Sequence, residues 1–330
     1  RPPLVESPTV VLLTVDALRA DLFTEANCKR FKTLCGMAAR GASFTNARTP
    51  ASATTTSLTA LFTGKYYSQI EWRNTETSSG AERLFPHADP STRFPELLAA
   101  AGVHTINASG RAGYARPYGI TRGFVVERDF GKTAAGMLSG MRDELKAAPP
   151  GPAFAYAHLL EPHAPYQGSG ATPYARYLSE IEAVDKALGR FIKAVDATPR
   201  GDSLIVIVSA DHGEAFGEHG TEFHGSTIYE ELIRVPIFVA GAGVRRVEVD
   251  VPVTLIDVGP TVLDLFGVET PGTFMGESLV PALRGDPFEP TRPIAADSSR
   301  WLQAMVFEDG MKIIYDARLR TTELYDTVKD

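Results

Sequence analysis

The chain has 330 residues, enough to bury a large core in one α/β domain with a small appendage. Hydrophobic residues make up 44% and charged residues 22% of the sequence, as is usual for globular proteins. The formal net charge of −7 gives no sign of the basic surface that is typical of nucleic-acid-binding proteins. The longest apolar runs have the length of strands, which excludes a transmembrane helix within the chain.

Four strongly apolar runs are continuous rather than alternating, which is typical of parallel strands covered on both faces of a sheet. They occupy residues 10–15, 154–157, 204–208 and 235–239, and a weaker run occupies residues 103–106. Helical patterns accompany them at residues 31–38 before Gly41, 91–101 before Gly102, 177–195 and 255–265. This alternation predicts an α/β fold with a doubly wound, mostly parallel sheet flanked by helices.

Two regions depart from this pattern. Residues 70–90 are polar and lack periodicity, and we interpret them as a long loop near the functional site. After about residue 271 the chain changes to short segments with a turn at Asp309-Gly310, which predicts antiparallel strands at residues 304–306, 311–315 and 323–326. We therefore expect a large α/β domain over residues 1–270 and a small C-terminal β subdomain over residues 271–330.

The sequence has two cysteines, Cys28 and Cys35. On one helix they would lie two turns apart, about 10.5 Å along the axis, whereas a disulfide needs Cα atoms within about 7 Å. A disulfide therefore requires the chain to turn near Asn27-Cys28 and fold back. Both states stay open, because a bridge suits an exported protein and free thiols suit a cytosolic one.

Carboxylate and imidazole side chains directly follow two of the predicted strands. Asp16 comes after residues 10–15, and Asp211-His212 come shortly after residues 204–208. In an open α/β sheet, ligands bind just beyond the carboxyl ends of the strands. Asp16 alone would suit the N-cap of a helix, but with Asp211 and His212 it forms a ligand set suited to zinc or manganese.

Two further segments carry groups that suit catalysis. A cluster of hydroxyls at residues 49–57 leads into a short helix that Gly64 ends, and a hydroxyl at a helix N-terminus is well placed to attack phosphorus or sulfur. The alternative is an ordinary Ser or Thr helix cap, and the cluster alone does not say which hydroxyl acts. Beyond the strand at residues 154–157 lie His158 and His163, which could ligate a metal, contact an anion or be structural.

Together these segments resemble the sulfatase-like branch of the alkaline phosphatase superfamily. The matching motifs fall in the family's order over nearly the whole chain, at residues 11–16, 57–64, 161–166, 211–220, 229–236, 276–279 and 323–326. The resemblance implies a metal-dependent enzyme that acts on anionic esters. It also implies that residues 1–270 form the catalytic domain.

Two departures from the family pattern indicate the subtype. Sulfatases of this family place a cysteine or serine, which is oxidised to formylglycine, ten residues before the glycine that corresponds to Gly64. Here that position is Thr54, which cannot become formylglycine, and Asp16 is followed by Ala17 where sulfatases usually carry a second aspartate. A threonine at this place resembles the relatives that transfer phosphoglycerol or phosphoethanolamine, and the phosphodiesterases.

The resemblance implies one divalent metal held by Asp16, Thr54, Asp211 and His212. Their donor atoms suit zinc or manganese, and calcium or magnesium are the alternatives. Thr54 would attack the ester and form a covalent phospho-threonine, so the implied function is that of a hydrolase or transferase of phosphate-type esters.

The resemblance also implies roles for three histidines beyond the metal ligands. His163 and His224 would be catalytic, and His163, His219 and His224 would bind the substrate anion. The alternative for His219 is that it only braces the glycine-rich loop in which it lies.

The implied partner is an anionic small-molecule or lipid head-group ester, not a nucleic acid. The chain opens at Arg1 in a proline-rich piece rather than at a methionine, so we expect a signal or membrane anchor upstream of it. That placement implies a periplasmic or extracellular protein, anchored to a membrane only through a segment outside this chain. A cytoplasmic location stays open.

Two other functions also stay open. One is a sulfuric ester hydrolase, which the lack of an oxidisable residue disfavours. The other is a catalytically silent binding domain, which the intact ligand set disfavours. An assay of aryl sulfate beside bis-aryl phosphate separates the first, and metal analysis of the pure protein separates the second.

Overall fold

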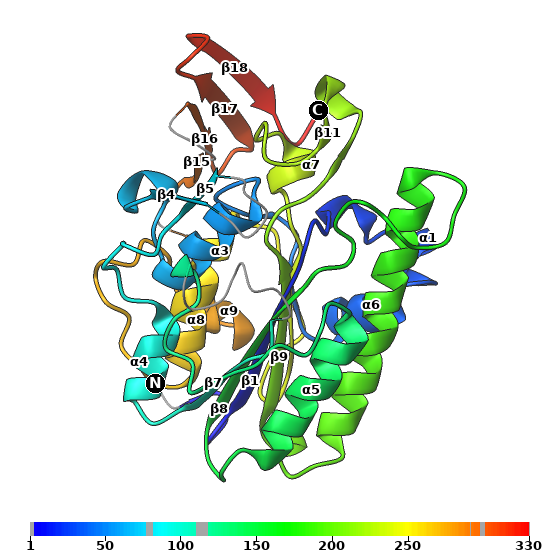
Figure 1. Ribbon diagram of the computed structural model, residues 1–330, viewed down its shortest axis with the longest axis vertical. Coiled ribbons are helices and arrows are strands. Elements are labelled where there is room, and N and C mark those ends of the chain that lie inside the picture. Colours follow the sequence, from blue (N-terminus) through cyan, green and yellow to red (C-terminus); the bar gives the residue numbers. More distant parts are fainter. Residues whose placement is uncertain (1–2, 77–81, 110–117, 291, 298–300, 330) are drawn as a thin grey trace.

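The computed structural model describes residues 3–76, 82–109, 118–290, 292–297 and 301–329. A large sheet runs through the molecule, helices cover both of its faces, and a small separate sheet lies at one end (Figure 1). The large sheet has eight strands in the order β13-β2-β12-β9-β1-β8-β6-β7. In chain order these are β1 (Thr9–Val15), β2 (Ala42–Phe44), β6 (His104–Asn107), β7 (Val126–Glu127), β8 (Ala153–Leu159), β9 (Leu204–Ala210), β12 (Ile237–Gly241) and β13 (Val247–Val249).

Most neighbouring strands of the large sheet are parallel, as the sequence predicts. β1 lies between β8 and β9, with Val15 opposite Leu159 on one side and Ala210 on the other. β12 is the exception, because it pairs antiparallel with both β9 and β2. The prediction of a parallel strand at residues 235–239 is therefore wrong in direction.

The reason lies in the connection between β9 and β12. Residues 211–236 contain only short elements: β10 (Ala215–Phe216), η6 (Glu218–Gly220), β11 (Glu222–Phe223) and α7 (Glu230–Ile233). A parallel neighbour needs a crossover, usually a helix, that carries the chain back to the opposite edge of the sheet. Without such a helix the chain enters β12 from the edge where β9 ends, and the two strands run in opposite directions.

The two faces of the large sheet bury two separate layers of side chains. Along β1, Val10 and Leu12 belong to one layer and Val11 and Leu13 to the other, which is the period of two of a strand covered on both faces. The first layer packs against α3 (Thr54–Thr63), α4 (Phe94–Ala100), α8 (Val258–Leu265) and α9 (Val280–Leu283). The second layer packs against α2 (Lys32–Arg40), α5 (Ala134–Ala147) and α6 (Pro173–Asp196). The sequence analysis does not predict α5. None of the helices in the described ranges combines the length and the apolar composition that a membrane crossing needs.

Residues 70–90 are not the long loop that their polarity suggests. β4 (Arg73–Glu76) pairs antiparallel with β5 (Glu82–Phe85). Among the residues of these two strands only Phe85 is buried. An exposed hairpin needs little hydrophobic alternation, so its sequence carries little of the signal by which strands are predicted. Residues 77–81, between the two strands, lie outside the described residues.

A second, antiparallel sheet lies near the C-terminus, as the short segments after residue 271 predict. It contains β15 (Ile294–Asp297), β16 (Leu302–Val306), β17 (Met311–Asp316) and β18 (Thr321–Asp326), in that order. The sequence analysis does not predict β15. Phe274 and Leu283 still pack into the core of the large sheet, and the domain boundary at residue 270 stays a prediction.

Three charged residues, which we call the docking cluster (Arg48, Glu230 and Lys312), join the small sheet to the large domain. Arg48 lies on β3 (Ala47–Arg48), which pairs with β14 (Val253–Thr254), and Lys312 lies on β17. Both side chains are almost completely buried, and their nitrogens lie 2.9 and 2.8 Å from the carboxylate oxygens of Glu230. Lys312 also donates to the carbonyl oxygen of Ile228.

Cys28 and Cys35 form a disulfide, with their Cα atoms 5.6 Å apart. The bridge is compatible with their spacing because α1 (Glu25–Cys28) ends at Cys28 and α2 begins only at Lys32. The chain turns between the two helices, as a disulfide at this spacing requires.

Candidate active site

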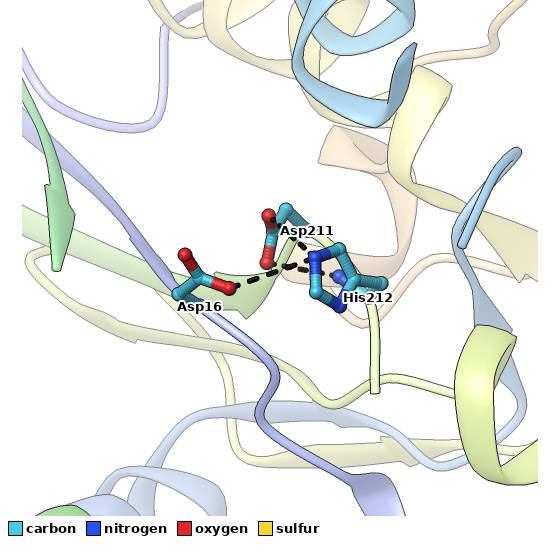
Figure 2. Close-up of side chains that lie close together, drawn as sticks. All are labelled: Asp16, Asp211 and His212. Atoms are coloured by element: carbon cyan, nitrogen blue, oxygen red, sulfur yellow. Dashed lines mark hydrogen bonds and ion pairs between the residues drawn. The ribbon is translucent and has the colours of Figure 1, made fainter. Parts of the chain in front are cut away.

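Asp16 and Asp211 lie together at the carboxyl edge of the large sheet because each directly follows one of two neighbouring parallel strands. β1 ends at Val15 and β9 at Ala210, and these two residues are opposite each other in register. His212 follows Asp211, and the side chains of Asp16, Asp211 and His212 are completely buried. Figure 2 shows the three side chains pointing at one another, and we call them the strand-end cluster.

Unprotonated atoms face one another within the strand-end cluster. Nδ1 of His212 lies 2.8 Å from the carbonyl oxygen of Gly213, which can only accept, so Nδ1 carries the hydrogen and Nε2 has a lone pair. Nε2 lies 3.5 Å from Oδ1 of Asp16 and 3.3 Å from Oδ2 of Asp211. Burial lowers the pKa of His212, although the carboxylates of Asp211 and Asp16 act in the opposite direction. The ring is therefore neutral.

The two carboxylate oxygens that face Nε2 of His212 lack partners. Oδ1 of Asp16 and Oδ2 of Asp211 are buried and accept no hydrogen bond from any residue that the structure describes. A buried carboxylate without compensation is costly. One donor atom from each of the three residues lies within 4.8 Å of the others, which suits a shared divalent cation. The cluster therefore fits the predicted metal, with one nitrogen and two oxygens as donors.

Backbone groups hold these side chains in place. Oδ1 of Asp211 accepts from the N–H groups of His212 (3.0 Å) and Ala17 (3.3 Å), which leaves Oδ2 facing the cluster. Ala17 has φ 59°, a left-handed conformation that non-glycine residues rarely adopt, so the chain turns sharply after Asp16. A side chain at Gly213 would lie 2.0 Å from the carbonyl oxygen of Glu231, so the close approach of these two segments requires glycine.

Thr54 reaches the strand-end cluster, as the family spacing predicts. It is the first residue of α3, and its Oγ1 lies 3.1 Å from Nε2 of His212. Two neighbouring hydroxyls turn away: Thr56 donates to the carbonyl oxygen of Ala53, and Ser57 to that of Ala51. The free N–H groups of the first turn of α3 begin at Thr54, which suits an anion bound there.

His158 also belongs to this site, although the sequence analysis assigns it no specific role. It lies on β8 opposite Thr14 of β1, and it is completely buried. Its Nε2 lies 3.2 Å from Oδ2 of Asp16, and its Nδ1 lies 2.9 Å from Oγ1 of Thr14. Burial alone would raise the pKa of Asp16, but the hydrogen bond from His158 holds it well below its ordinary value.

The structure places His224 beside His212 and His163 beside His224, and their contact with a substrate anion stays a prediction. The rings of His212 and His224 stack with centroids 4.1 Å apart, and the ring of His163 lies 4.9 Å from that of His224. Nδ1 of His224 donates to Oε1 of the fully buried Glu214 at 2.8 Å. Burial would lower the pKa of His224, but Glu214 outweighs this effect and raises it.

Glu214 is a second residue whose role sequence reasoning missed. Besides His224, it accepts a hydrogen bond from the hydroxyl of Tyr166 at 2.8 Å. Tyr166 comes from the loop that carries His163, so one carboxylate joins the two histidine-bearing loops. The motif at residues 211–214 contains Glu214. Its contact with His224 depends on the antiparallel pairing of β10 and β11, which the motif does not reveal.

His219 makes a different set of contacts. Its ring stacks on Tyr229 with centroids 3.8 Å apart, and its Nδ1 lies 3.0 Å from Oε1 of Glu231. Its side chain is 41% exposed, and the ring of Tyr325 from the small sheet lies edge-on to it with centroids 6.4 Å apart. These contacts fit the bracing role better than substrate binding, which stays a prediction for this residue.

Comparison with known sequences extends the resemblance over most of the chain. The family model described as Sulfatase matches residues 8–268. The delta 4,5-hexuronate-2-O-sulfatase of Bacteroides thetaiotaomicron is 29% identical over 173 residues, which are 48% of this chain and 36% of that protein. The choline-sulfatase of Rhizobium meliloti is 31% identical over 161 residues, 47% of this chain and 31% of that protein. The matches thus span about a third of the length of these curated relatives.

Solved structures share the whole fold at low sequence identity. The phosphonate monoester hydrolase of Silicibacter pomeroyi superimposes with a TM-score of 0.75 at 18% identity, covering 98% of this chain and 90% of that one. A protein solved in complex with its substrate D-glucosamine-2-N,6-O-disulfate gives a TM-score of 0.75 at 16% identity, covering 98% and 92%. This likeness confirms the predicted fold class.

Proposed function

The chain belongs to the sulfatase family, and we propose that it is a metal-dependent hydrolase or transferase of phosphate-type esters with Thr54 as its nucleophile. One observation carries the proposal: the Thr54 hydroxyl lies 3.1 Å from His212, at the N-terminus of α3 and beside two buried carboxylate oxygens without partners. A hydroxyl, a helix N-terminus and a cation site then meet at one point, where an anionic ester can be bound and attacked.

Asp16, Asp211 and His212 would hold the metal, with Thr54 as a fourth donor. When bound, a divalent metal lowers the pKa of the Thr54 hydroxyl and neutralises negative charge on the ester. The mixed nitrogen and oxygen donors favour zinc or manganese over calcium, which takes six to eight oxygens. Calcium and magnesium are the alternative metals.

The residues around Thr54 supply the other parts of the reaction. Thr54 loses its hydroxyl proton to solvent, and its Oγ1 forms a bond to phosphorus as the bond from phosphorus to the leaving oxygen breaks. That oxygen takes the electron pair and a proton from His224 or His163. Water or an acceptor alcohol then gives a proton to the same histidine and attacks phosphorus. The bond from phosphorus to Oγ1 breaks, and Thr54 regains a proton from solvent.

The identity of residue 54 favours phosphate-type esters over sulfate esters. A sulfatase of the formylglycine type needs a cysteine or serine at this position, and threonine cannot be oxidised to that aldehyde. Threonine can still act directly as an alkoxide nucleophile. Sulfuric ester hydrolysis is the second candidate, favoured by the family match and by the sulfatases among the relatives.

The substrate that fits this site is an anionic small molecule or lipid head-group ester. The amides of α3, and the ring of His224 in its protonated form, favour a negatively charged group. The relatives named above include sulfatases and a phosphonate monoester hydrolase, whose substrates are anionic esters. The Cys28–Cys35 disulfide supports a periplasmic or extracellular location, because such bridges persist in oxidising compartments.

A paired assay tests the proposal. The purified protein, loaded with zinc or manganese, is expected to hydrolyse bis(4-nitrophenyl) phosphate faster than 4-nitrophenyl sulfate, and intact mass of a quenched reaction should show a phosphoryl adduct on Thr54. Faster turnover of the sulfate would favour the sulfuric ester hydrolase. If the protein binds no metal and turns over neither ester, it is a catalytically silent binding domain.

A further inference from the structure

A buried chain of hydrogen bonds leads from the interior of the large sheet to Asp16. The hydroxyl of Tyr156 lies 2.9 Å from Oγ1 of Thr14, which lies 2.9 Å from Nδ1 of His158. Nε2 of His158 then lies 3.2 Å from Oδ2 of Asp16. All four side chains are completely buried. The chain exists because β1 and β8 are parallel neighbours that place Thr14 directly opposite His158.

The direction of donation in this chain follows from its last member. A carboxylate oxygen accepts hydrogen bonds, so the bond to Asp16 requires the hydrogen on Nε2 of His158. In a neutral ring Nδ1 then has the lone pair, and it accepts from the hydroxyl of Thr14. Oγ1 of Thr14 in turn can accept from the hydroxyl of Tyr156. Every bond therefore donates toward Asp16, and the Thr14 hydroxyl supports the ring tautomer that Asp16 requires by donating to Nδ1.

This arrangement divides the work between the two oxygens of Asp16. Oδ2 is held by His158, whereas Oδ1 has no hydrogen-bond partner in the described residues and faces Nε2 of His212 at 3.5 Å. A carboxylate held at one oxygen cannot rotate freely, so the other oxygen keeps its direction. Oδ1 of Asp16 is the oxygen that a cation between Asp211 and His212 would use.

We propose that His158 is a positioning residue for the metal site: its Nε2–H group, oriented by Thr14, fixes the carboxylate of Asp16 so that Oδ1 faces the metal. The inference rests on the proposed metal-dependent function. The competing role is direct ligation, since Nε2 of His158 also lies 3.9 Å from Oδ2 of Asp211. In that role Nε2 would carry a lone pair and no hydrogen, so the two roles are chemically exclusive.

Metal affinity in a set of variants tests the proposal. His158→Ala removes the donor, and affinity for Zn²⁺, measured by competition with a chromophoric chelator, is expected to fall about 10- to 100-fold. His158→Gln offers an amide N–H near the former Nε2 and should recover most of the loss. Thr14→Val, which frees the ring to take the other tautomer, should lower affinity by a smaller factor. Unchanged affinity in His158→Ala would overturn the proposal.

Controls lie at the opposite edge of the same sheet. His104 begins β6, next to β8, and Thr9 begins β1, so both are far from the carboxyl edge of the sheet. His104→Gln and Thr9→Val should bind Zn²⁺ with wild-type affinity. A loss in these controls equal to that in His158→Ala and Thr14→Val would mean that the strands, rather than the hydrogen bonds, set the affinity, and would also overturn the proposal.

Cobalt substitution separates positioning from ligation. With His158 outside the ligand shell, the visible absorption spectrum of the Co²⁺-saturated His158→Gln variant should match that of the wild type. A changed spectrum at saturation would show that His158 is a ligand and would overturn the proposal.

A measurement on the metal-free protein keeps this inference distinct from the proposed function. Long-range ¹H–¹⁵N spectra of histidine-labelled protein, with the His158 signals identified by their loss in His158→Gln, should show hydrogen on Nε2 and none on Nδ1. Hydrogen on Nδ1 alone would overturn the assignment. If instead the wild type binds none of the metals while the Nε2–H tautomer is found, the proposed function fails and the Asp16–His158 bond stands.

Discussion

The docking cluster and the strand-end cluster both bury charged side chains, but they differ in how completely their atoms are paired. In the docking cluster, both nitrogen-bearing side chains contact Glu230, and Lys312 also donates to a backbone carbonyl. Its buried polar atoms all have partners within the described residues. In the strand-end cluster, one oxygen of Asp16 and one of Asp211 have none, and both face the lone pair of His212.

Under the proposed function, this difference separates residues that stabilise the fold from residues that bind a ligand. The docking cluster balances charge internally, so it needs nothing further and attaches the small sheet to the large domain. The strand-end cluster concentrates electron pairs that repel one another, and only a cation supplied from outside would balance them. Changes in the first should therefore alter stability, and changes in the second should alter turnover and metal binding.

Thr54→Ala is expected to have the largest effect on turnover. The nucleophile is lost, so kcat on bis(4-nitrophenyl) phosphate should fall by roughly 10³-fold or more. Stability in urea should change by less than about 1 kcal/mol, because the N-cap of α3 is Ala53 and Thr54 does not cap it. Thr56→Ala, in the same helical turn, is the matched control and should keep its turnover. Wild-type rates in Thr54→Ala would mean that water attacks the ester directly.

His224 should produce the next largest effect, through its proton. His224→Ala is expected to lower turnover by about 10²-fold while metal content stays constant. Because the pKa of His224 is raised, the ring is protonated below that pKa, and kcat/KM should decline as the pH rises through it. Glu214→Gln removes the charge that raises this pKa, so the alkaline limb of the profile should move to lower pH.

The matched control is Glu231→Gln, which alters the same kind of contact at His219. It should leave the alkaline limb in place if His219 only braces its loop. A shift as large as that of Glu214→Gln would instead place His219 in the reaction.

The sequence predicts the strand-end cluster well because its signal is local. Each of the two strands is a continuous apolar run, and Asp16 and Asp211 follow those strands directly. The spacing between Thr54 and Gly64 likewise lies within one short helix. Partners across the sheet are not local, so the sequence names His158 as a candidate but does not predict its contacts. Its pairing with Thr14 depends on β1 and β8 being neighbours in a particular register.

The errors in the fold have similar causes. The direction of β12 depends on whether residues 211–236 cross the sheet, which apolar runs alone do not reveal. The hairpin of β4 and β5 is too exposed to show alternation. In α5 the buried Met137, Met141 and Leu145 do follow a helical period, but Gly136 and Gly140 lower the helix propensity of the same segment.

Glu230→Gln should alter stability and leave turnover per folded molecule unchanged. It leaves the charges of Arg48 and Lys312 buried without their counter-ion, which should cost about 3 kcal/mol in free energy of unfolding. Burial would raise the pKa of Glu230, but Lys312 and Arg48 lower it from 4.5 to about 2. Its contribution is thus present above pH 4.5 and is lost as the pH falls toward 2.

Urea unfolding at a series of pH values measures this effect. The gap in stability between the wild type and Glu230→Gln should be largest near neutral pH and should close as the pH falls below about 3. Glu269→Gln, at an exposed position, is the control and should match the wild type throughout. A constant gap at every pH would show that the lost stability is not due to the charge of Glu230.

Asp211→Asn should have the smallest effect on the free energy of unfolding, and the sign of that effect is the sharpest test of the contrast between the two clusters. The amide keeps Oδ1 as the acceptor for the N–H groups of Ala17 and His212 and replaces Oδ2 by a donor that faces the lone pair of His212. In the presence of a chelator, the variant should therefore be more stable than the wild type by about 1 kcal/mol, because a buried acceptor without a partner becomes a paired donor. With saturating Zn²⁺ the order should reverse, since only the wild type gains the free energy of metal binding.

Denaturant unfolding in both buffers measures the two differences. A variant that is less stable than the wild type in chelator, as Glu230→Gln is expected to be, would show that the strand-end cluster is already balanced without a cation.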